Sequence, residues 1–267
     1  MSQNILKNTI EDLELLRSTV PLVHNITNYV VMNNTANALL AIGASPIMAH
    51  AIEEVEEMVT ICSATVINIG TLSEPWIQSM EKAAKKAVTI GKPLVLDPVG
   101  AGASNIRNTA IRRILDAGHP SIVRGNASEI LSTLSSSGKT KGVDATDSSE
   151  SAVDTGKSLS NVTGGVVVIS GATDYILKGT IQAQISNGDA LMTKVTGLGC
   201  TASALCGAFA AVQKDQFRAA TSAMAVMGIA GEMAKTKTSS PGSFQVAFLD
   251  ALYELNADTI KQRLNAK

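Results

Sequence analysis

The chain has little of several features that mark particular protein classes. Among its 267 residues there are three cysteines and three histidines, aromatic residues make up 3% and charged residues 17%. Three cysteines are few and odd in number, which argues against a disulfide framework and favours a reducing compartment. The scattered histidines lack the spacing of a zinc site. A net charge of -1 with few stacking rings argues against a nucleic-acid-binding protein.

Long apolar runs are also missing. No run approaches the roughly 20 residues that span a bilayer, and residues 1–20 carry Glu11, Asp12 and Glu14, which a signal peptide would not. We therefore predict a cytoplasmic protein with no membrane partner. The length predicts a single domain over residues 1–267. The low charge predicts a largely covered surface, under helices on both faces of a sheet or under partner subunits.

What is present is an alternation of short apolar runs and amphipathic stretches. The apolar runs predict strands at 21–24, 64–69, 93–97, 121–124 and 165–170. The stretches between them predict helices at 28–42, 74–90, 105–117 and from about 126. Asn28 fits the start of the first of these helices as its cap, and Gly43 fits its end. Continuous apolar strands between helices are typical of a parallel sheet covered on both faces.

Residues 173–195 differ from this pattern. Strand-like runs alternate there with the turn pairs Lys178-Gly179 and Asn187-Gly188, which predicts antiparallel hairpins at one sheet edge. From Gly199 onward the pattern is mostly helical, and residues 135–149 are predicted to be a surface loop. The predicted fold class is therefore α/β, with a central, mostly parallel sheet, helices on both faces and an antiparallel edge.

The segment Val195-Thr196-Gly197-Leu198-Gly199-Cys200-Thr201-Ala202 is the most informative in the chain. It passes from a β-branched run through two glycines directly into an Ala-rich helix. A glycine turn points several backbone N–H groups the same way, and the helix start adds partial positive charge. Together they predict a seat for a phosphoryl group, although a plain tight turn is the alternative interpretation. Cys200 lies at its rim, where we expect the pKa of the thiol to fall.

Polar groups also follow the predicted strands, at the sheet edge where ligands of open α/β sheets bind. Asp97 precedes Pro98, which favours an extended backbone and places the carboxylate at the strand tip, unless the pair is only a turn. Asn126 and Glu129 have the spacing of a capping box, which needs no function to explain it. Glu129, near Asp97, could also hold a hydrated Mg²⁺.

Two further strand-end residues complete the set. Arg124 could bind a phosphate, and Ser170 adds a hydroxyl at the end of a buried strand. An anion seat, two carboxylates for a metal, a basic residue and a hydroxyl are the parts that phosphoryl transfer needs, because its transition state requires mainly positioning and charge neutralisation.

These residues resemble a known family. A Gly-x-Gly before a helix, preceded by Asn-x-x-Glu and a strand-end Asp, resembles the ribokinase-like superfamily. Six segments, spread in order from about Pro21 to about Leu255, are similar to the hydroxyethylthiazole kinase family of thiamine salvage. They are Ile26-Thr27-Asn28, Gly43-Ala44-Ser45-Pro46-Ile47-Met48, Asn68-Ile69-Gly70-Thr71-Leu72, Asp97-Pro98-Val99-Gly100-Ala101-Gly102-Ala103, Arg124-Gly125-Asn126-Ala127-Ser128-Glu129-Ile130 and Pro241-Gly242-Ser243-Phe244.

The resemblance implies ATP-dependent phosphorylation of the hydroxyl of 4-methyl-5-(2-hydroxyethyl)thiazole, assisted by Mg²⁺. It also implies a homotrimer with the thiazole pocket between subunits. By position, the resemblance implies that Asp97 and Glu129 bind the metal and that Arg124 and Ser170 bind ATP. It implies that the thiazole is bound by Asn28, Met48 and Gly197. The implied catalytic loop consists of Gly197, Leu198, Gly199 and Cys200.

Three positions depart from the patterns that the resemblance supplies. The superfamily has an Asp base where this chain has Cys200, as the thiazole kinases do, so we expect a modest base with most catalysis from the anion seat and the metal. Leu198 stands where Ala is usual and Ser170 where Thr is usual. The serine keeps the hydroxyl, whereas the leucine could narrow the mouth of the site.

Other functions remain open from the sequence alone. Within the same fold these are a hydroxymethylpyrimidine-type kinase and a nucleotide-dependent lyase that dehydrates hydrated NAD(P)H. A nucleotide-binding regulator without turnover is a third, although it would not need the metal carboxylates Asp97 and Glu129. A nicotinamide dehydrogenase is disfavoured because no Gly-x-Gly-x-x-Gly follows the first strand. The roles of His50 and of the segment Pro241 to Phe244 are not assigned.

Overall fold

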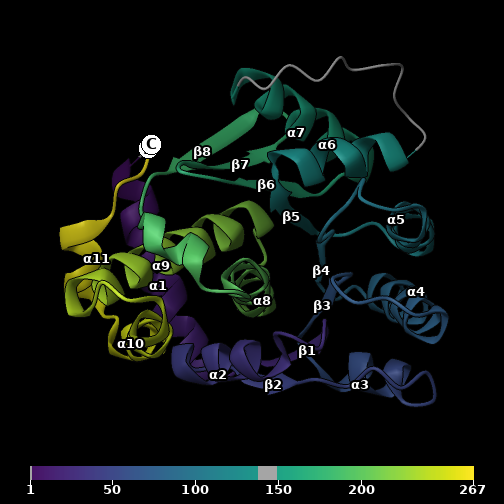
Figure 1. Cartoon of the computed structure of the whole chain (residues 1–267), viewed down its shortest axis with the longest axis horizontal. Helices are drawn as coiled ribbons and strands as arrows, with labels where there is room; N and C mark the ends of the chain where they lie inside the picture. The colour runs from purple at the N-terminus through teal and green to yellow at the C-terminus, as the bar shows by residue number, and fades with distance from the viewer. Residues whose placement is uncertain (1, 138–148) are drawn as a thin grey trace.

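A computed structural model describes residues 2–137 and 149–267, and its central feature is one eight-stranded sheet between two layers of helices (Figure 1). The strands are β1 (Leu22–Ile26), β2 (Ser45–Ile47), β3 (Ala64–Asn68), β4 (Leu94–Asp97), β5 (Ile122–Asn126), β6 (Val166–Ser170), β7 (Asp174–Lys178) and β8 (Ile181–Ile185). The helices are α1 (Ser2–Thr19), α2 (Met32–Ile42), α3 (Val55–Ile61), α4 (Glu74–Thr89), α5 (Asn105–Ala117), α6 (Ala127–Ser136), α7 (Ser149–Thr163), η1 (Ala190–Lys194), α8 (Leu198–Val212), α9 (Gln216–Lys237), α10 (Pro241–Glu254) and α11 (Ala257–Arg263).

The sheet has the predicted mixture of parallel and antiparallel pairing. The strand order is β2-β1-β3-β4-β5-β6-β7-β8, and every pair from β2 to β6 is parallel. Strands β7 and β8 pair antiparallel and form one edge. The expected α/β class, with an antiparallel edge and helices on both faces, is therefore confirmed.

Alternating strand residues build two separate cores. In β3, Val66 packs into the core beneath α8 and α9, whereas its neighbour Ile67 packs into the core beneath α4. This alternation follows from the period of two in a strand. Helices α3 to α7 cover one face, and α8 and α9 cover the other, with α1, α10 and α11 outside them (Figure 1). Because both faces are covered, the central strands are mostly apolar, with a few buried polar residues such as His24, Asn25 and Thr65.

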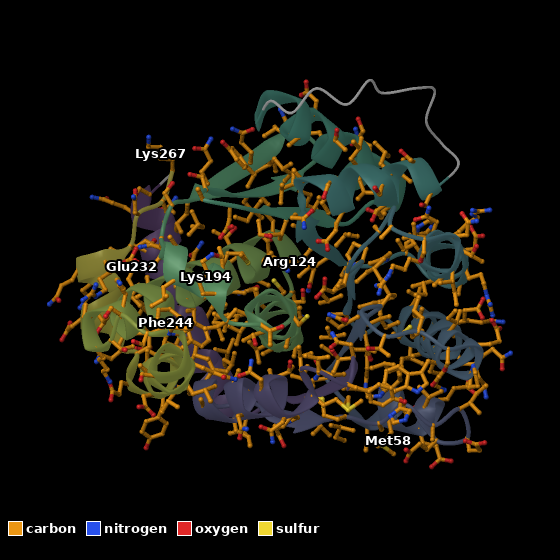
Figure 2. The ribbon with its side chains drawn as sticks, viewed as in Figure 1. Met58, Arg124, Lys194, Glu232, Phe244 and Lys267 are labelled. Carbon is orange, nitrogen blue, oxygen red and sulfur yellow. The ribbon has the colours of Figure 1, made fainter. Side chains whose placement is uncertain are left out.

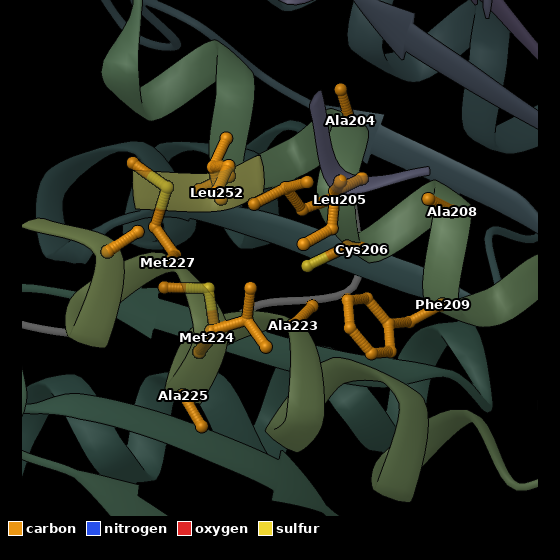
Figure 3. Close-up of a cluster of buried hydrophobic side chains, with 14 of the residues drawn as sticks. Ala204, Leu205, Cys206, Ala208, Phe209, Ala223, Met224, Ala225, Met227 and Leu252 are labelled. Atoms are coloured by element: carbon orange, nitrogen blue, oxygen red, sulfur yellow. The ribbon is translucent and has the colours of Figure 1, made fainter. Parts of the chain in front are cut away.

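Helix α8 lies directly on the sheet, and this placement brings its first turn to the strand ends. Eleven of the fifteen residues of α8 are buried, and Leu205, Cys206 and Phe209 lie in one buried cluster with Ala223 and Met224 of α9 (Figure 3). Gly207 permits the close approach, because a Cβ there would collide with the side chain of Val66 on β3. A larger residue at that position would push α8 away from the sheet.

Several predicted boundaries are confirmed. Helix α5 spans 105–117 as predicted, and α4 begins at Glu74 and ends one residue before the predicted end. Gly43 ends α2 in the left-handed conformation, with φ of 107°. The end of the chain adds a short antiparallel bridge to β8, between Ile185 and Ala266, which covers that edge.

Other predictions were wrong or incomplete. Helix α2 begins at Met32 rather than at Asn28, and Val31 occupies its cap position without a side-chain hydrogen bond. The short elements β2 and α3 were not predicted. Residues 190–194 form the 3₁₀ helix η1, where the pattern predicted hairpin strands. Most of the loop predicted at 135–149 lies outside the described residues.

The N-terminal helix is held by a buried ion pair. The Asp12 carboxylate, fully buried, accepts hydrogen bonds from Arg218 Nε at 2.9 Å and from Ser222 Oγ at 2.7 Å, both on α9. This fixes α1 against α9 on the outer side of the core. Across residues 2–137 and 149–267, no helix combines the length and apolar character needed to cross a membrane.

Candidate active site at the strand ends

The carboxyl ends of the parallel strands bring the predicted polar residues to one edge of the sheet. Asn68, the last residue of β3, is in register with Asp97, the last residue of β4. Asn126 at the end of β5 is likewise in register with Ser170 at the end of β6. Residues paired in a parallel ladder lie side by side, so the sheet register alone assembles these groups.

The first turn of α8 lies at the same edge. Its N-cap Gly197 has φ of 85°, a left-handed conformation that favours glycine, and a Cβ there would lie 2.8 Å from Cγ1 of Val31. Leu198, Gly199 and Cys200 are the first three helical residues. The N–H groups of a first turn have no acceptor within their helix, so they are available to an anion. The predicted seat therefore has the required backbone geometry.

A row of hydrogen bonds connects the strand ends to Cys200. The Asn28 Nδ2 donates to Asn68 Oδ1 at 3.0 Å and to Cys200 Sγ at 3.5 Å. The Asn68 Nδ2 in turn donates to Asp97 Oδ2 at 2.7 Å. Residues from the loop after β1, from β3, from β4 and from α8 thus form one connected polar row.

Asp97 is the most strongly perturbed carboxylate of this row. Burial raises its pKa to about 6, although the Arg124 guanidinium acts in the opposite direction. Its second oxygen, Oδ1, makes no hydrogen bond of regular geometry among the described residues, although the Ser203 hydroxyl of α8 lies near enough to lower the pKa of Asp97. An unsatisfied buried carboxylate oxygen is costly for the fold, which marks a functional position.

The expectation for the Cys200 thiol was wrong. Burial, and next the Asp97 carboxylate, raise the pKa of Cys200 to about 11, against the opposing effects of Asn68, Asn28 and Arg124. The sequence placed Cys200 correctly at a helix start. It did not reveal that this helix start is buried beside a carboxylate, and both of these factors disfavour a thiolate. Cys200 therefore holds its proton at neutral pH.

Arg124 and Ser170 meet on the other side of the first turn of α8. The Arg124 Nη2 donates to Ser170 Oγ at 2.7 Å, and a Cβ on Gly199 would lie 3.0 Å from Arg124 Nη1. Figure 2 shows Arg124 near the centre of the view, beside α8. The Nε of Arg124 is buried without a hydrogen-bond partner in the described part of the chain. The guanidinium thus keeps donor capacity for an anion.

These two residues line one end of a large cavity. The cavity has a volume of about 570 Å³ and lies between the end of β6, the segment 187–193, the start of α8 and the middle of α9. Its apolar walls are Met192, Leu198, Ala202, Met224 and Met227. A volume of this size accepts a nucleotide-sized ligand. Asp174 also lines it, and burial raises the pKa of Asp174 to about 6.

Glu129 forms the predicted capping box. The Asn126 side chain accepts from the Glu129 N–H, and Glu129 Oε2 accepts from the Asn126 N–H, both at 2.9 Å. The other oxygen, Oε1, accepts from the N–H of Gly100 at 2.9 Å. Glu129 therefore links the start of α6 to the glycine-rich loop after Asp97, and it lies close enough to raise the pKa of Asp97.

Of the remaining predicted residues, one is hydrogen-bonded to the site and the others are not. Asn28 joins the site through Cys200, whereas Met48 follows β2 and is half-buried against the core beneath α8. Neither lines the large cavity. His50 packs against Trp76 in a tilted arrangement, with ring centroids 4.4 Å apart. The segment Pro241 to Phe244 begins α10, where Phe244 is a fully buried core residue, so its local role is structural.

Asn68 is the site residue to which the sequence reasoning gave no role. It ends a predicted apolar strand just as Asp97 does, so the signal was a polar residue at the tip of a buried strand. It was not recognised because an asparagine in that position usually starts a turn. Only the register of β3 against β4 shows that its amide faces Asp97.

Comparisons with known proteins agree with this geometry. The sequence model of the hydroxyethylthiazole kinase family matches residues 13–258. A hydroxyethylthiazole kinase of Leptospira biflexa serovar Patoc is 94% identical over 267 residues, which is 100% of each chain. One of Syntrophus aciditrophicus is 56% identical over 259 residues, covering 97% of this chain and 96% of that one.

Solved structures give the same result for the fold. A hydroxyethylthiazole kinase protein from Pyrococcus horikoshii OT3 superimposes with a TM-score of 0.91 at 44% identity, covering 98% of both chains. A pyridoxal kinase from Staphylococcus aureus in complex with ADP superimposes with a TM-score of 0.63 at 17% identity, covering 80% of this chain and 88% of that one. This second likeness concerns the fold alone.

The fold and the site define a small-molecule kinase with a ribokinase-like architecture. The family match over most of the chain then decides between the kinases of this fold. The chain belongs to the hydroxyethylthiazole kinase family and is a phosphotransferase.

Proposed function

We propose that this chain transfers the terminal phosphoryl group of ATP to the hydroxyl of 4-methyl-5-(2-hydroxyethyl)thiazole, a reaction of thiamine salvage. The observation that carries the proposal is the connected row Asp97–Asn68–Asn28–Cys200, which ends at the first turn of α8, with Arg124 and the large cavity on the other side of that turn. The hydroxyl that accepts the phosphoryl group and the ATP that donates it can therefore meet at one helix start that binds anions.

ATP occupies the cavity lined by Arg124 and Ser170. The apolar walls from Met224 and Met227 suit the flat base, and Arg124 with the start of α8 suits the phosphates. The buried, unpartnered Nε of Arg124 supports this role, because an incoming phosphate oxygen would satisfy it.

The loop Gly197, Leu198, Gly199 and Cys200 holds the transferring group. The free N–H groups of this turn, together with the helix dipole, stabilise the charge on its equatorial oxygens. In a loose phosphoryl-transfer transition state, this positioning supplies most of the rate. Cys200 faces the acceptor hydroxyl; because its pKa is raised to about 11, only the small thiolate fraction present at neutral pH can take the hydroxyl proton, so its contribution to the rate is modest.

The donor set at the strand ends fits a magnesium ion. Asp97 Oδ1 is a buried oxygen near the Ser203 hydroxyl but without a hydrogen bond of regular geometry in the described residues, and Mg²⁺ prefers one or two carboxylates together with water and phosphate oxygens. Glu129 uses one lone pair on each oxygen for Asn126 and Gly100, which leaves capacity for a metal-bound water. Bound there, Mg²⁺ would neutralise phosphate charge.

The thiazole binds at Asn28, Met48 and Gly197, in a pocket completed by a second subunit of a homotrimer. Apolar side chains just before α2 support a covered surface there, since Tyr29 is 63% exposed and Val30 70%. The chain of 27.7 kDa is then a single ribokinase-like domain over residues 1–267 within each subunit. Its ATP requirement and three free thiols favour the cytoplasm.

The test is an ATP-consumption assay with three acceptors: the hydroxyethylthiazole, a hydroxymethylpyrimidine and hydrated nicotinamide cofactor. We expect phosphorylated thiazole, identified by mass, and dependence on magnesium. Turnover with the pyrimidine alone, or water loss from the hydrated cofactor, would reject the proposal in favour of the kinase or lyase alternatives of the same fold. Light scattering tests the trimer, for which we expect three times the mass of the single chain.

A further inference from the structure

Asn187 is a buried polar residue of the cavity wall that the proposed reaction does not use. It follows β8 and begins the segment 187–193, which lines the cavity together with Met224 and Met227 of α9. A buried amide side chain usually has a structural partner, so its hydrogen bonds identify what it holds.

Asn187 joins three separate parts of the chain. Its Nδ2 donates to Glu232 Oε1 of α9 at 2.9 Å and to the carbonyl of Arg263 at the end of α11 at 2.7 Å. Its Oδ1 accepts from the backbone N–H of Asn265 at 2.8 Å. Glu232 Oε1 accepts a further bond from the N–H of Gly188 at 3.2 Å. We refer to Asn187, Glu232 and residues 263–265 as the clasp.

The clasp is anchored at its far side as well. Ser186 N donates to the carbonyl of Asn265, and Gln184 exchanges two backbone hydrogen bonds with Lys267, all at 2.9 Å. Figure 2 shows Glu232, Lys194 and Lys267 on the same side of the molecule. The segment after α11 is thus held along β8 up to the point where the cavity wall begins.

The cavity wall also lies unusually close to α9. A Cβ on Gly228 would lie 2.6 Å from the carbonyl oxygen of Asn187, and a Cβ on Gly231, one helical turn further, would collide with Met192 Sδ. These two glycines face the wall on one side of α9. The clasp and this close contact together fix the position of the segment 187–193 relative to Met224 and Met227 of α9.

We propose that Asn187 is a positioning residue for the nucleotide: through the clasp, residues 263–265 set the width of the cavity at the end remote from Arg124. This rests on the proposed function, because it takes the cavity as the ATP site. The clasp touches neither Cys200 nor Asp97, so it affects nucleotide affinity and leaves the acceptor side unchanged.

Two substitutions test the clasp at different atoms. Asn187→Asp keeps the size of the side chain but replaces the donating amide nitrogen with an oxygen. This oxygen then faces Glu232 and the Arg263 carbonyl, which are both acceptors. Asn265→Pro removes the N–H that donates to Asn187 Oδ1 and also fixes φ at position 265, while the preceding Leu264, with ψ of 122°, already has a conformation compatible with a following proline. Asn265→Ala, which keeps the N–H, is the matched control.

We expect the KM for ATP to rise about tenfold in Asn187→Asp and about threefold to tenfold in Asn265→Pro, as loss of one or two buried hydrogen bonds would give. The kcat and the KM for the thiazole should stay within about twofold of wild type, and Asn265→Ala should match wild type in all three. Calorimetric binding of ATP to each folded variant, without thiazole, should show the same order.

A fall in kcat with the KM for ATP unchanged would overturn the inference, as would wild-type values in both variants. If Asn187→Asp does not fold, Asn265→Pro decides alone, and failure of both to fold would show that the clasp holds the fold rather than the nucleotide. If wild type itself does not phosphorylate the thiazole, then the proposed function fails, and calorimetric ATP binding still tests the clasp.

Discussion

Asn28 Nδ2 lies 3.0 Å from Asn68 Oδ1 and 3.5 Å from Cys200 Sγ, so one amide group connects the loop after β1 to a strand end and to the start of α8. The N–H of Gly70 also donates to Asn68 Oδ1, at 2.9 Å, which fixes the orientation of the Asn68 amide. The donors therefore point toward the two acceptors at the ends of the row, Cys200 and Asp97.

Replacement of Cys200 tests its role as a weak base. Because a base works best with a pKa near the working pH, Cys200→Asp should retain or raise kcat at pH 7, whereas Cys200→Ala should lower it only partly, by about 10- to 100-fold. The rate of wild type should rise with pH toward 11, the pKa of the thiol, and that of Cys200→Asp should not. Steady-state kcat against pH measures both, and Cys206→Ala, which changes another buried thiol of α8, is the control. Complete loss of activity in Cys200→Asp would contradict this role.

Asn68→Asp places a second carboxylate against Asp97. The 2.7 Å hydrogen bond then becomes a contact between two oxygens that compete for one proton. We expect kcat to fall about 100-fold. The loss of stability relative to wild type should be larger at pH 8 than at pH 5, because a raised carboxylate pKa makes stability fall as pH rises from the unfolded pKa toward the folded one. Asn37→Asp, at an exposed position of α2, adds the same charge and should change neither kcat nor the pH dependence. Equal behaviour of the two variants would reject the role of Asn68.

Asp174 is a second buried carboxylate, besides Asp97, that makes the free energy of unfolding depend on pH. Burial raises its pKa from 3.8 to about 6, so its contribution to stability is fully present below pH 4 and is lost as pH rises through 6. Asp174→Asn keeps the Oδ1 that accepts the Gly171 N–H and removes this loss, which amounts to about 3 kcal/mol at most.

Denaturant unfolding at pH 5 and pH 8 measures this effect. The variant should gain about 3 kcal/mol over wild type at pH 8 and only about half of that at pH 5, because a carboxylate of pKa 3.8 in the unfolded chain is already ionised there. His24, whose pKa burial lowers, acts in the opposite direction in both proteins and cancels in the difference. Asp116→Asn, at an exposed position of α5, is the control. A gain of the same size at both pH values would contradict the assignment.

Asp12→Asn should destabilise the fold without touching the site. It removes the charge that Arg218 and Ser222 share and leaves the partly buried guanidinium with only the exposed Glu11 as its ion-pair partner, at a cost of about 2 to 4 kcal/mol. Glu11→Gln changes the exposed member of the same cluster and should cost less than about 1 kcal/mol. Unfolding free energies at pH 7 give both values, and equal costs would show that burial of Asp12 has no special weight.

The elements that the sequence predicted are those with a long, regular pattern. In α4, Trp76, Met80, Ala83 and Ala87 recur every three or four residues and all face the core, so its limits were found to within one residue. Strand β2 has three half-buried residues and α3 has seven residues, which is too short for either period to appear. The helix start at Asn28 was wrong because that side chain binds Asn68 instead of capping α2.

The amino-acid sequence by itself determined the parallel sheet, its antiparallel edge and the positions of Asp97, Arg124, Ser170 and the Gly197 turn, because each of these depends on neighbouring residues in the chain. The tertiary structure alone decided that Asn68 faces Asp97, that the segment 187–193 closes a cavity against α9, and that the Cys200 thiol stays protonated. Those properties depend on which distant groups are packed together, since desolvation and buried charge are set by the surroundings of an atom rather than by its neighbours in sequence.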